Sequence, residues 1–299
     1  MRILSDFDGV LTDQTEEAQR VLDLFMQRFC EATGLNQSDA KTLIENIENE
    51  MKQNPTENGW RMSGRITAFA NEDLFIHNNG IAALLDDKAK SNDQTATKLL
   101  SQLHKNDIRS FSDLMQWAYE QMVKETHVGK LKPMDPATKT VINHLLGKGH
   151  TITIVSNSGT DRILNLLKNE GLEAYSHDEN PNARLKVRGD ARKFELEDPK
   201  KGFNVPENNN SYWVDVARPR YETIVKEELP HVVIGDVFTL DLAVPLSLTR
   251  IAPENFGGMQ LFLRKRNYTP QWSEKFIRNN HEKSAKLNVL NDLKELLEL

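Results

Sequence analysis

Three short apolar runs, each leading into acidic or hydroxyl-bearing residues, constrain the fold of this chain more than any other feature. They are residues 2–7, 151–155 and 232–235. The second run, Thr-Ile-Thr-Ile-Val, is β-branched throughout and favours a buried strand. Continuous apolar strands of this kind belong in a parallel sheet that helices cover on both faces. The sequence therefore predicts an α/β fold with a Rossmann-like, doubly wound parallel sheet.

Helix signals separate these runs. Asp135 and Pro136 predict a helix start, because Asp is a favoured N-cap and Pro a favoured first helical residue. The other expected elements are helices over residues 135–146, 161–170 and 219–230, a strand over 246–251, irregular or antiparallel β structure over 172–216, and an amphipathic helix within 272–299.

The segment over residues 15–130 has a different character. It is polar, and apolar residues such as Val21, Phe25 and Phe29 recur in it at helical spacing. Over residues 65–75 alone, the sequence pattern fits either a helix or a strand. We therefore expect a helical domain over 15–130, inserted into an α/β domain made of residues 1–14 and 131–299.

Composition and charge limit the classes of function. The chain has 299 residues and a formal net charge of -6, which argues against a nucleic-acid or membrane-surface partner, because both need a basic face. The single cysteine, Cys30, excludes a disulfide within the chain. Neither a secretory leader nor an apolar run of roughly 18 residues is found. We expect a cytoplasmic protein.

The polar residues that follow the three apolar runs are candidates for chemistry. Asp6 and Asp8 stand at the end of the first, Ser156 follows the second, and Asp236 with Asp241 follows the third. Parallel strands present their carboxyl ends at one edge of the sheet, where ligands bind. Crowded carboxylates repel each other unless a cation offsets them, and hard oxygen ligands suit Mg²⁺. The sequence predicts a magnesium site that receives a phosphate group.

The spacing of Asp6 and Asp8 allows two roles. Residues two apart in an extended segment point the same way, so both side chains can face one substrate. One carboxylate can attack phosphorus while the other handles the proton of the leaving group.

Four short segments in order resemble the motifs of the haloacid dehalogenase (HAD) superfamily of phosphotransferases. They are residues 5–12 (Ser-Asp-Phe-Asp-Gly-Val-Leu-Thr), 155–157 (Val-Ser-Asn), 217–221 (Ala-Arg-Pro-Arg-Tyr) and 234–241 (Ile-Gly-Asp-Val-Phe-Thr-Leu-Asp). The resemblance covers the expected α/β domain. It implies that the insert is a cap, which closes over the active site and selects the substrate.

The resemblance also implies roles for single residues. Asp6 is the expected nucleophile and Asp8 the general acid and base, with the backbone carbonyl of Asp8 on the metal. The Ser156 hydroxyl and the Asn157 backbone N–H are expected to hold phosphoryl oxygens. The expected cation beside the phosphate is Arg218, with Arg220 as second choice, although the family more often has lysine. The expected Mg²⁺ ligands are Asp6, Asp8, Asp236 and Asp241, the last acting through water or the cation.

One stretch of the insert could touch the substrate. Residues 58–65 combine two glycines with Trp60, Arg61 and Arg65. These three residues are candidates for substrate specificity. The alternative, an ordinary turn with an anchored tryptophan and solvated arginines, stays open.

The expected function is Mg²⁺-dependent hydrolysis of a small phosphorylated metabolite through an aspartyl-phosphate intermediate. Phosphotransfer or mutase activity stays open, because a sugar hydroxyl can replace water. Carbon–halogen cleavage is disfavoured by Asp8, since that reaction needs neither an acid at this position nor Mg²⁺. A binding module without catalysis is the remaining alternative, and the joint presence of the aspartates and Ser156 argues against it.

Overall fold

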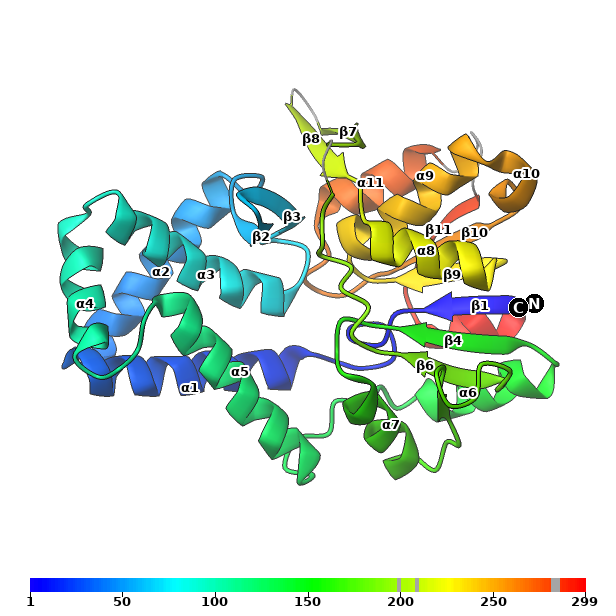
Figure 1. Cartoon of the computed structure of the whole chain (residues 1–299), viewed down its shortest axis with the longest axis horizontal. Coiled ribbons are helices and arrows are strands. Elements are labelled where there is room, and N and C mark those ends of the chain that lie inside the picture. The colour runs from blue at the N-terminus through cyan, green and yellow to red at the C-terminus, as the bar shows by residue number, and fades with distance from the viewer. Residues whose placement is uncertain (198–199, 208–209, 281–285) are drawn as a thin grey trace. The chain divides into compact units, whose positions relative to one another are not determined.

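The computed structural model describes residues 1–197, 200–207, 210–280 and 286–299 (Figure 1). The chain divides into two compact units. The core unit consists of Met1–Asp13, Arg61–Ala68 and Met134–Leu299, and the helical unit of Gln14–Trp60 and Phe69–Pro133. Arg61–Ala68, which falls within the insert expected over residues 15–130, thus groups with the core unit.

A seven-stranded sheet forms the centre of the core unit. Its strand order is β11-β10-β9-β1-β4-β6-β5, and each described pair is parallel. The strands are β1 (Arg2–Ser5), β4 (Thr151–Val155), β5 (Tyr175–Ser176), β6 (Leu185–Arg188), β9 (Val232–Gly235), β10 (Gln260–Arg264) and β11 (Lys286–Leu290). The predicted α/β fold with a parallel sheet is confirmed.

Helices flank this sheet because its strands are apolar on both faces. Ile3, Ile152 and Ile234 belong to one buried cluster with α6 (Thr138–Gly147) and α7 (Thr160–Asn169). The side chains that alternate with these along each strand point to the opposite face of the sheet. β1 also contacts α8. The remaining helical elements of the core unit are α8 (Pro219–Glu228), the π-helix η1 (Phe238–Leu242), α9 (Ala243–Ile251), α10 (Pro253–Phe256), α11 (Gln271–Asn280) and the 3-10 helix η2 (Leu293–Glu298).

Two hairpins lie outside the main sheet. β2 (Gly59–Met62) pairs with β3 (Arg65–Phe69). β7 (Gly202–Glu207) pairs in antiparallel fashion with β8 (Asn210–Asp215). The second hairpin is fixed by aromatic packing, because Phe203 lies edge-on to Phe238 of η1 and stacks on Phe276 of α11.

Several predicted elements differ from the observed ones. Residues 246–251, predicted as a strand, lie in α9. A short, mostly apolar run fits either a strand or a helix, so the pattern alone does not distinguish them. Residues 172–216 contain the parallel strands β5 and β6 as well as the β7–β8 hairpin, and 272–299 contains β11 in addition to the predicted helix. Parts of these two ranges, 198–199, 208–209 and 281–285, lie outside the described residues.

The helical unit is built from amphipathic helices. They are α1 (Thr15–Thr33), α2 (Gln37–Gln53), α3 (Leu74–Lys90), α4 (Gln94–His104) and α5 (Phe111–His127). Four begin at an Asn, Asp or Ser whose side chain accepts a hydrogen bond from a first-turn backbone N–H. Phe29 is fully buried between Phe25 and Phe111, with ring centroids 5.6 and 6.0 Å away. No helix among the described residues is long and apolar enough to span a membrane.

Removing the Phe29 ring should destabilise the helical unit. We expect Phe29→Ala to lower the free energy of unfolding by about 3–5 kcal/mol, because it leaves a cavity between two aromatic rings. Urea denaturation followed by circular dichroism measures the loss. The exposed Asp23 on the same helix gives the control, since Asp23→Ala should change stability by less than about 0.5 kcal/mol. Equal losses in the two variants would contradict this packing.

Candidate functional site

The strand register brings the three predicted polar segments to one edge of the sheet. β1 lies between β4 and β9, with Ser5 opposite both Ile154 and Ile234. The residues that follow these three strands therefore lie at the same edge of the sheet. The backbone N–H of Asp6 extends the ladder by donating to the Ile234 carbonyl over 2.8 Å.

Three of these residues form a buried carboxylate cluster. Oxygens of Asp6, Asp236 and Asp241 all lie within 4.8 Å of one another. Asp6 is 8% exposed, and the other two are each 1% exposed. Three buried negative charges at this spacing repel each other strongly, so the cluster requires positive charge or protons.

Two glycines allow the carboxylates to come this close. A Cβ on Gly9 would lie 1.8 Å from Asp236 Oδ2, and a Cβ on Gly235 would lie 2.1 Å from the Asp241 Cβ. Gly9 also has φ of +75°, a conformation that side chains disfavour. The glycines of the first and fourth segments are therefore required for the geometry of the cluster.

Lys193 supplies positive charge inside the cluster. Its Nζ donates to Asp6 Oδ1 and Asp241 Oδ1, each over 2.8 Å, and its residue is 1% exposed. Burial alone would lower the pKa of Lys193, but the charges of Asp241 and Asp6 outweigh it and raise that pKa. The ammonium also lies 5.3 Å from the ring centroid of Tyr221, whose hydroxyl donates to the Asp241 main-chain carbonyl. Lys193 is thus held as a cation.

The backbone of Lys193 is fixed on both sides. Its N–H donates to Asn157 Oδ1 over 2.7 Å, and its carbonyl accepts from the Arg218 guanidinium. Asp190 and Arg192 precede it with φ of +51° and +47°, which costs backbone energy. The side chain of Asn157, expected to act through its backbone N–H, therefore positions the lysine.

The cation that contacts Asp6 is Lys193, whereas Arg218, the predicted cation beside the phosphate, donates to backbone carbonyls. Arg218 is 1% exposed and donates to the carbonyls of Asp215, Lys193 and Thr67. Arg218 fits the expected sequence pattern because it precedes Pro219 at a helix start. Lys193 instead comes from the loop after β6, a strand that the sequence reading did not recognise. The signal for Lys193 is the strand over residues 185–188, because the residues after a parallel strand lie at this edge of the sheet.

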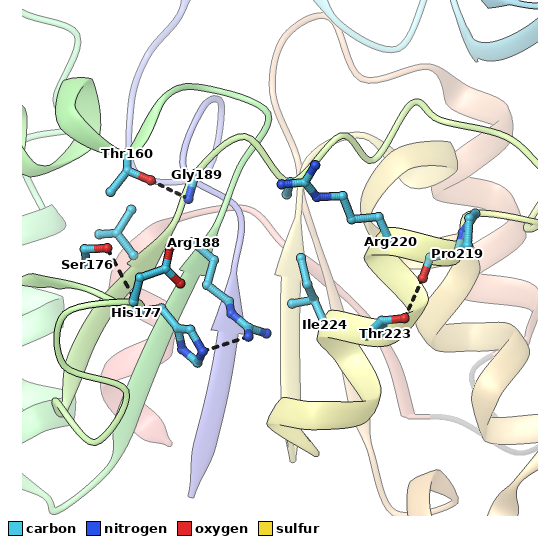
Figure 2. A pocket seen from close by; sticks show the side chains of 12 residues that line it. Thr160, Ser176, His177, Arg188, Gly189, Pro219, Arg220, Thr223 and Ile224 are labelled. Carbon is cyan, nitrogen blue, oxygen red and sulfur yellow. Dashed lines mark hydrogen bonds between the residues drawn. The ribbon is translucent and has the colours of Figure 1, made fainter.

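Arg220, the second choice for this cation, lies elsewhere. It is exposed on the first turn of α8 and lines a cavity of 530 Å³. Figure 2 shows Arg220 and Ile224 on one side of this cavity, facing His177 and Arg188 on the other. Among the described residues that line it, none belongs to the carboxylate cluster. The structure does not bring Arg220 to Asp6.

Asp8 has different partners from Asp6. Its Oδ2 accepts from the hydroxyls of Ser156 (3.0 Å) and Ser158 (2.7 Å). Its Oδ1 accepts from Arg162 Nη1 over 2.8 Å. Arg162 and Ser158 were not singled out in the sequence, although both lie within six residues of Ser156. Asp8 and Ser156 lie together, as predicted, and the Arg162 guanidinium places a positive charge beside them.

The two aspartates of the first segment consequently differ in acidity. Burial raises the pKa of Asp6 well above its usual range, and the Asp241 charge adds to the rise, while Lys193 opposes it. Burial also acts to raise the pKa of Asp8, but the Arg162 charge and the hydrogen bonds from Ser158, Arg162 and Ser156 outweigh it and lower that pKa. Asp6 holds a proton more readily than Asp8.

The predicted specificity residues lie on the first hairpin. Trp60 and Arg61 belong to β2, where Trp60 is half-buried and Arg61 exposed. Arg65 begins β3 and donates to the Glu197 carbonyl over 2.8 Å and to the Asp215 carboxylate. Because Arg65 is engaged in this way, a role in binding substrate would require it to leave these partners.

The carboxylate cluster fits a divalent cation. It offers three hard oxygen ligands at one point, the donor set that Mg²⁺ prefers. One lysine offsets only part of three carboxylate charges. Asp8 is predicted to bind the metal through its backbone carbonyl, and its side chain binds Arg162 and the two serines. Asp6, Asp236 and Asp241 are the residues whose side chains could hold the ion.

The raised pKa of Asp6 predicts how stability depends on pH. The folded state keeps a proton on Asp6 that the unfolded chain loses near the ordinary aspartate pKa. Without metal, the free energy of unfolding should therefore fall as pH rises from the ordinary aspartate pKa through the raised pKa of Asp6. Asp6→Asn removes this charge, so it should raise the melting temperature in EDTA at pH 7 and flatten its decline with pH. Thermal unfolding measures both effects.

The control for this prediction is the exposed Asp178, whose change to Asn should leave the profile as in the wild type. A lower melting temperature for Asp6→Asn at pH 7 would contradict the prediction.

No protein-family model matches the sequence, and no curated protein matches it. Solved structures do match nearly the whole chain. In the three that follow, the match covers 99% of this chain and 96% of the solved chain. The HAD phosphatase from Thermococcus onnurineus is 13% identical with a TM-score of 0.46. YfnB from Bacillus subtilis, provisionally named a HAD-hydrolase and bound to magnesium, is 15% identical with a TM-score of 0.46. A 2-haloacid dehalogenase from Pseudomonas syringae is 12% identical with a TM-score of 0.40. We infer activity from the side chains at the strand ends.

Proposed function

We propose that this chain is a HAD-superfamily phosphatase, which hydrolyses a small phosphate monoester with Mg²⁺ through an aspartyl-phosphate on Asp6. The observation that carries the proposal is the buried Asp6 carboxylate, which contacts the Lys193 ammonium on the edge where Asp8 and Ser156 also lie. A nucleophile, a cation, a hydroxyl donor and a second carboxylate are the groups that phosphoryl transfer through aspartate needs.

The first half of the reaction transfers the phosphoryl group to the protein. A carboxylate oxygen of Asp6 attacks phosphorus, and the bond from phosphorus to the ester oxygen breaks. Lys193 and the Ser156 hydroxyl stabilise the phosphoryl oxygens, and Asp8 gives its proton to the leaving alcohol. Positioning and charge neutralisation supply most of the acceleration in reactions of this type.

The second half releases inorganic phosphate. Asp8, now a carboxylate, takes a proton from water while the water oxygen attacks phosphorus. The bond between phosphorus and Asp6 breaks, which restores the Asp6 carboxylate and the protonated Asp8. One carboxyl group thus serves as acid and then as base.

Asp8 must hold a proton at the start, although Arg162 and the two serines favour its ionised form. Substrate provides the change. A phosphate group that accepts hydrogen bonds from Ser156 and Arg162 takes these donors away from Asp8 and adds negative charge nearby. Both effects raise the pKa of Asp8.

Mg²⁺ would be held by Asp6 and Asp236, with the Asp8 backbone carbonyl as the resemblance implies. When bound, the ion offsets the charge of the carboxylates and of the phosphoryl oxygens. Asp241 has two other partners, Lys193 and the backbone N–H of Val237, which donates to its Oδ2 over 3.0 Å. Its main task is therefore to orient the lysine. The helical unit has the place in sequence of a cap that selects the substrate.

A screen of phosphorylated metabolites with Mg²⁺ tests the proposal, with released phosphate as the readout. Parallel assays for phosphorylated product isomers and for halide from 2-haloacids separate hydrolysis from phosphotransfer and dehalogenation. Phosphate release from at least one monoester supports the proposal. A protein that is inert across the panel, or that releases halide only, contradicts it.

Loss of the nucleophile or of the metal should abolish turnover. We expect Asp6→Asn to reduce kcat below detection, because the amide oxygen is a poor nucleophile, and excess EDTA to do the same for the wild type. The control Asp178→Asn should keep wild-type activity. Full activity in metal-free buffer, or in Asp6→Asn, would count against an aspartyl-phosphate route.

Lys193 should matter for catalysis as strongly as an oxyanion donor. We expect Lys193→Met to lower kcat by roughly 10²–10³-fold, because the developing charge on the phosphoryl oxygens loses its cation. The control is Lys200→Met, since the Lys200 ammonium lies over the exposed Trp213 ring. Phosphate release under saturating Mg²⁺ is the measurement, and unchanged kcat in Lys193→Met would refute this role.

A further inference from the structure

The turn after β10, residues 265–269, carries two side chains that the mechanism above does not use, one in contact with the cluster and one with the loop that follows Asp8. The turn is closed by two hydrogen bonds between Arg266 and Thr269. The Arg266 N–H donates to Thr269 Oγ1 over 2.8 Å, and the Thr269 N–H donates to the Arg266 carbonyl over 3.2 Å. β10 is the neighbour of β9 in the sheet, so the turn emerges beside the segment that carries Asp236.

Tyr268 contacts the cluster directly. Its hydroxyl donates to Asp236 Oδ2 over 3.2 Å. Asp236 is 1% exposed, so the orientation of its carboxylate depends on protein groups rather than bulk water. A hydrogen bond of this kind orients a carboxylate that binds a metal ion.

Arg266 holds the loop that follows Asp8. Its guanidinium donates to the carbonyl oxygens of Gly9, Val10 and Thr12. Its Nη1 also lies 3.6 Å from Asp135 Oδ2. A planar guanidinium can donate hydrogen bonds to several carbonyls at once. A lysine ammonium on its flexible side chain does not reproduce this geometry.

The two contacts converge on one place through Gly9. The backbone of Gly9 packs so closely against Asp236 that an added Cβ would overlap the carboxylate. Arg266 fixes the Gly9 carbonyl, and Tyr268 fixes the Asp236 carboxylate. One short turn therefore sets both the position of the first segment and the orientation of the fourth.

We propose that residues 265–269 form a fifth segment of the site, in which Tyr268 and Arg266 are positioning residues for the divalent cation held by Asp6 and Asp236. The inference rests on the proposed function, because it presumes that metal site. Neither residue touches the phosphate in this scheme. Tyr268 acts through the Asp236 carboxylate, and Arg266 through the backbone that follows Asp8.

Titration of the full-length protein with Mg²⁺ alone, by calorimetry, tests Tyr268 without any substrate. We expect Tyr268→Phe to raise the Kd for Mg²⁺ roughly 10-fold, as changes next to metal ligands do. Its melting temperature in EDTA should match the wild type, because the ring remains. The control is Tyr175→Phe, since Tyr175 is exposed and its hydroxyl binds Glu173.

Arg266→Lys is the second variant. It keeps the positive charge beside Asp135 but loses the fork on the three carbonyls, so we expect the Kd for Mg²⁺ to rise as well. Arg278→Lys is the matched control, because Arg278 is exposed on α11 and binds Glu274.

The outcomes separate this inference from the proposed function. A wild-type protein that takes up no Mg²⁺ would overturn both. A wild type that binds Mg²⁺, with a Tyr268→Phe variant whose Kd lies within two-fold of it, would overturn this inference alone. So would a Tyr268→Phe variant whose melting temperature in EDTA falls, because the tyrosine would then have a general structural role.

Discussion

The contact of the Lys193 ammonium with Asp6 and Asp241 is the interaction on which the site depends. Buried carboxylates at this spacing are tolerated only with nearby positive charge. The fold fixes the lysine accordingly. Asn157 binds its N–H, Arg218 binds its carbonyl, and the preceding loop accepts two residues with positive φ. One lysine does not balance three carboxylates, and this remaining charge is the physical basis of the proposed cation site.

The sheet brings these groups together through register rather than through sequence proximity. β1 lies between β4 and β9, so the residues that follow the three strands meet at one edge. β6 and β10 lie one strand further out on either side, and the loops after them deliver Lys193 and Tyr268. Each of these five strands therefore contributes a segment to the same place, which is the general behaviour of parallel sheets.

This arrangement explains what the sequence could and could not predict. The inner strands β4 and β9 are continuous apolar runs, and their ranges were predicted as observed. β6 is four residues of alternating character, Leu-Lys-Val-Arg, and resembled irregular structure, so the lysine that follows it was missed. Arg218 carried the expected pattern before Pro219, but sequence does not reveal that its guanidinium is buried against backbone carbonyls. Local patterns predict strands and their ends, whereas the partner of a charge depends on tertiary packing.

The acidities of Asp6 and Asp8 are opposite to those that the proposed roles require. A nucleophile must be ionised, yet burial among acids raises the pKa of Asp6; a general acid must be protonated, yet Arg162 and the serines lower the pKa of Asp8. A cation held by Asp6 and Asp236 favours the ionised Asp6, and a phosphate on Ser156 and Arg162 favours the protonated Asp8. In the proposed mechanism, metal and substrate together would therefore bring the two carboxyl groups to their working states.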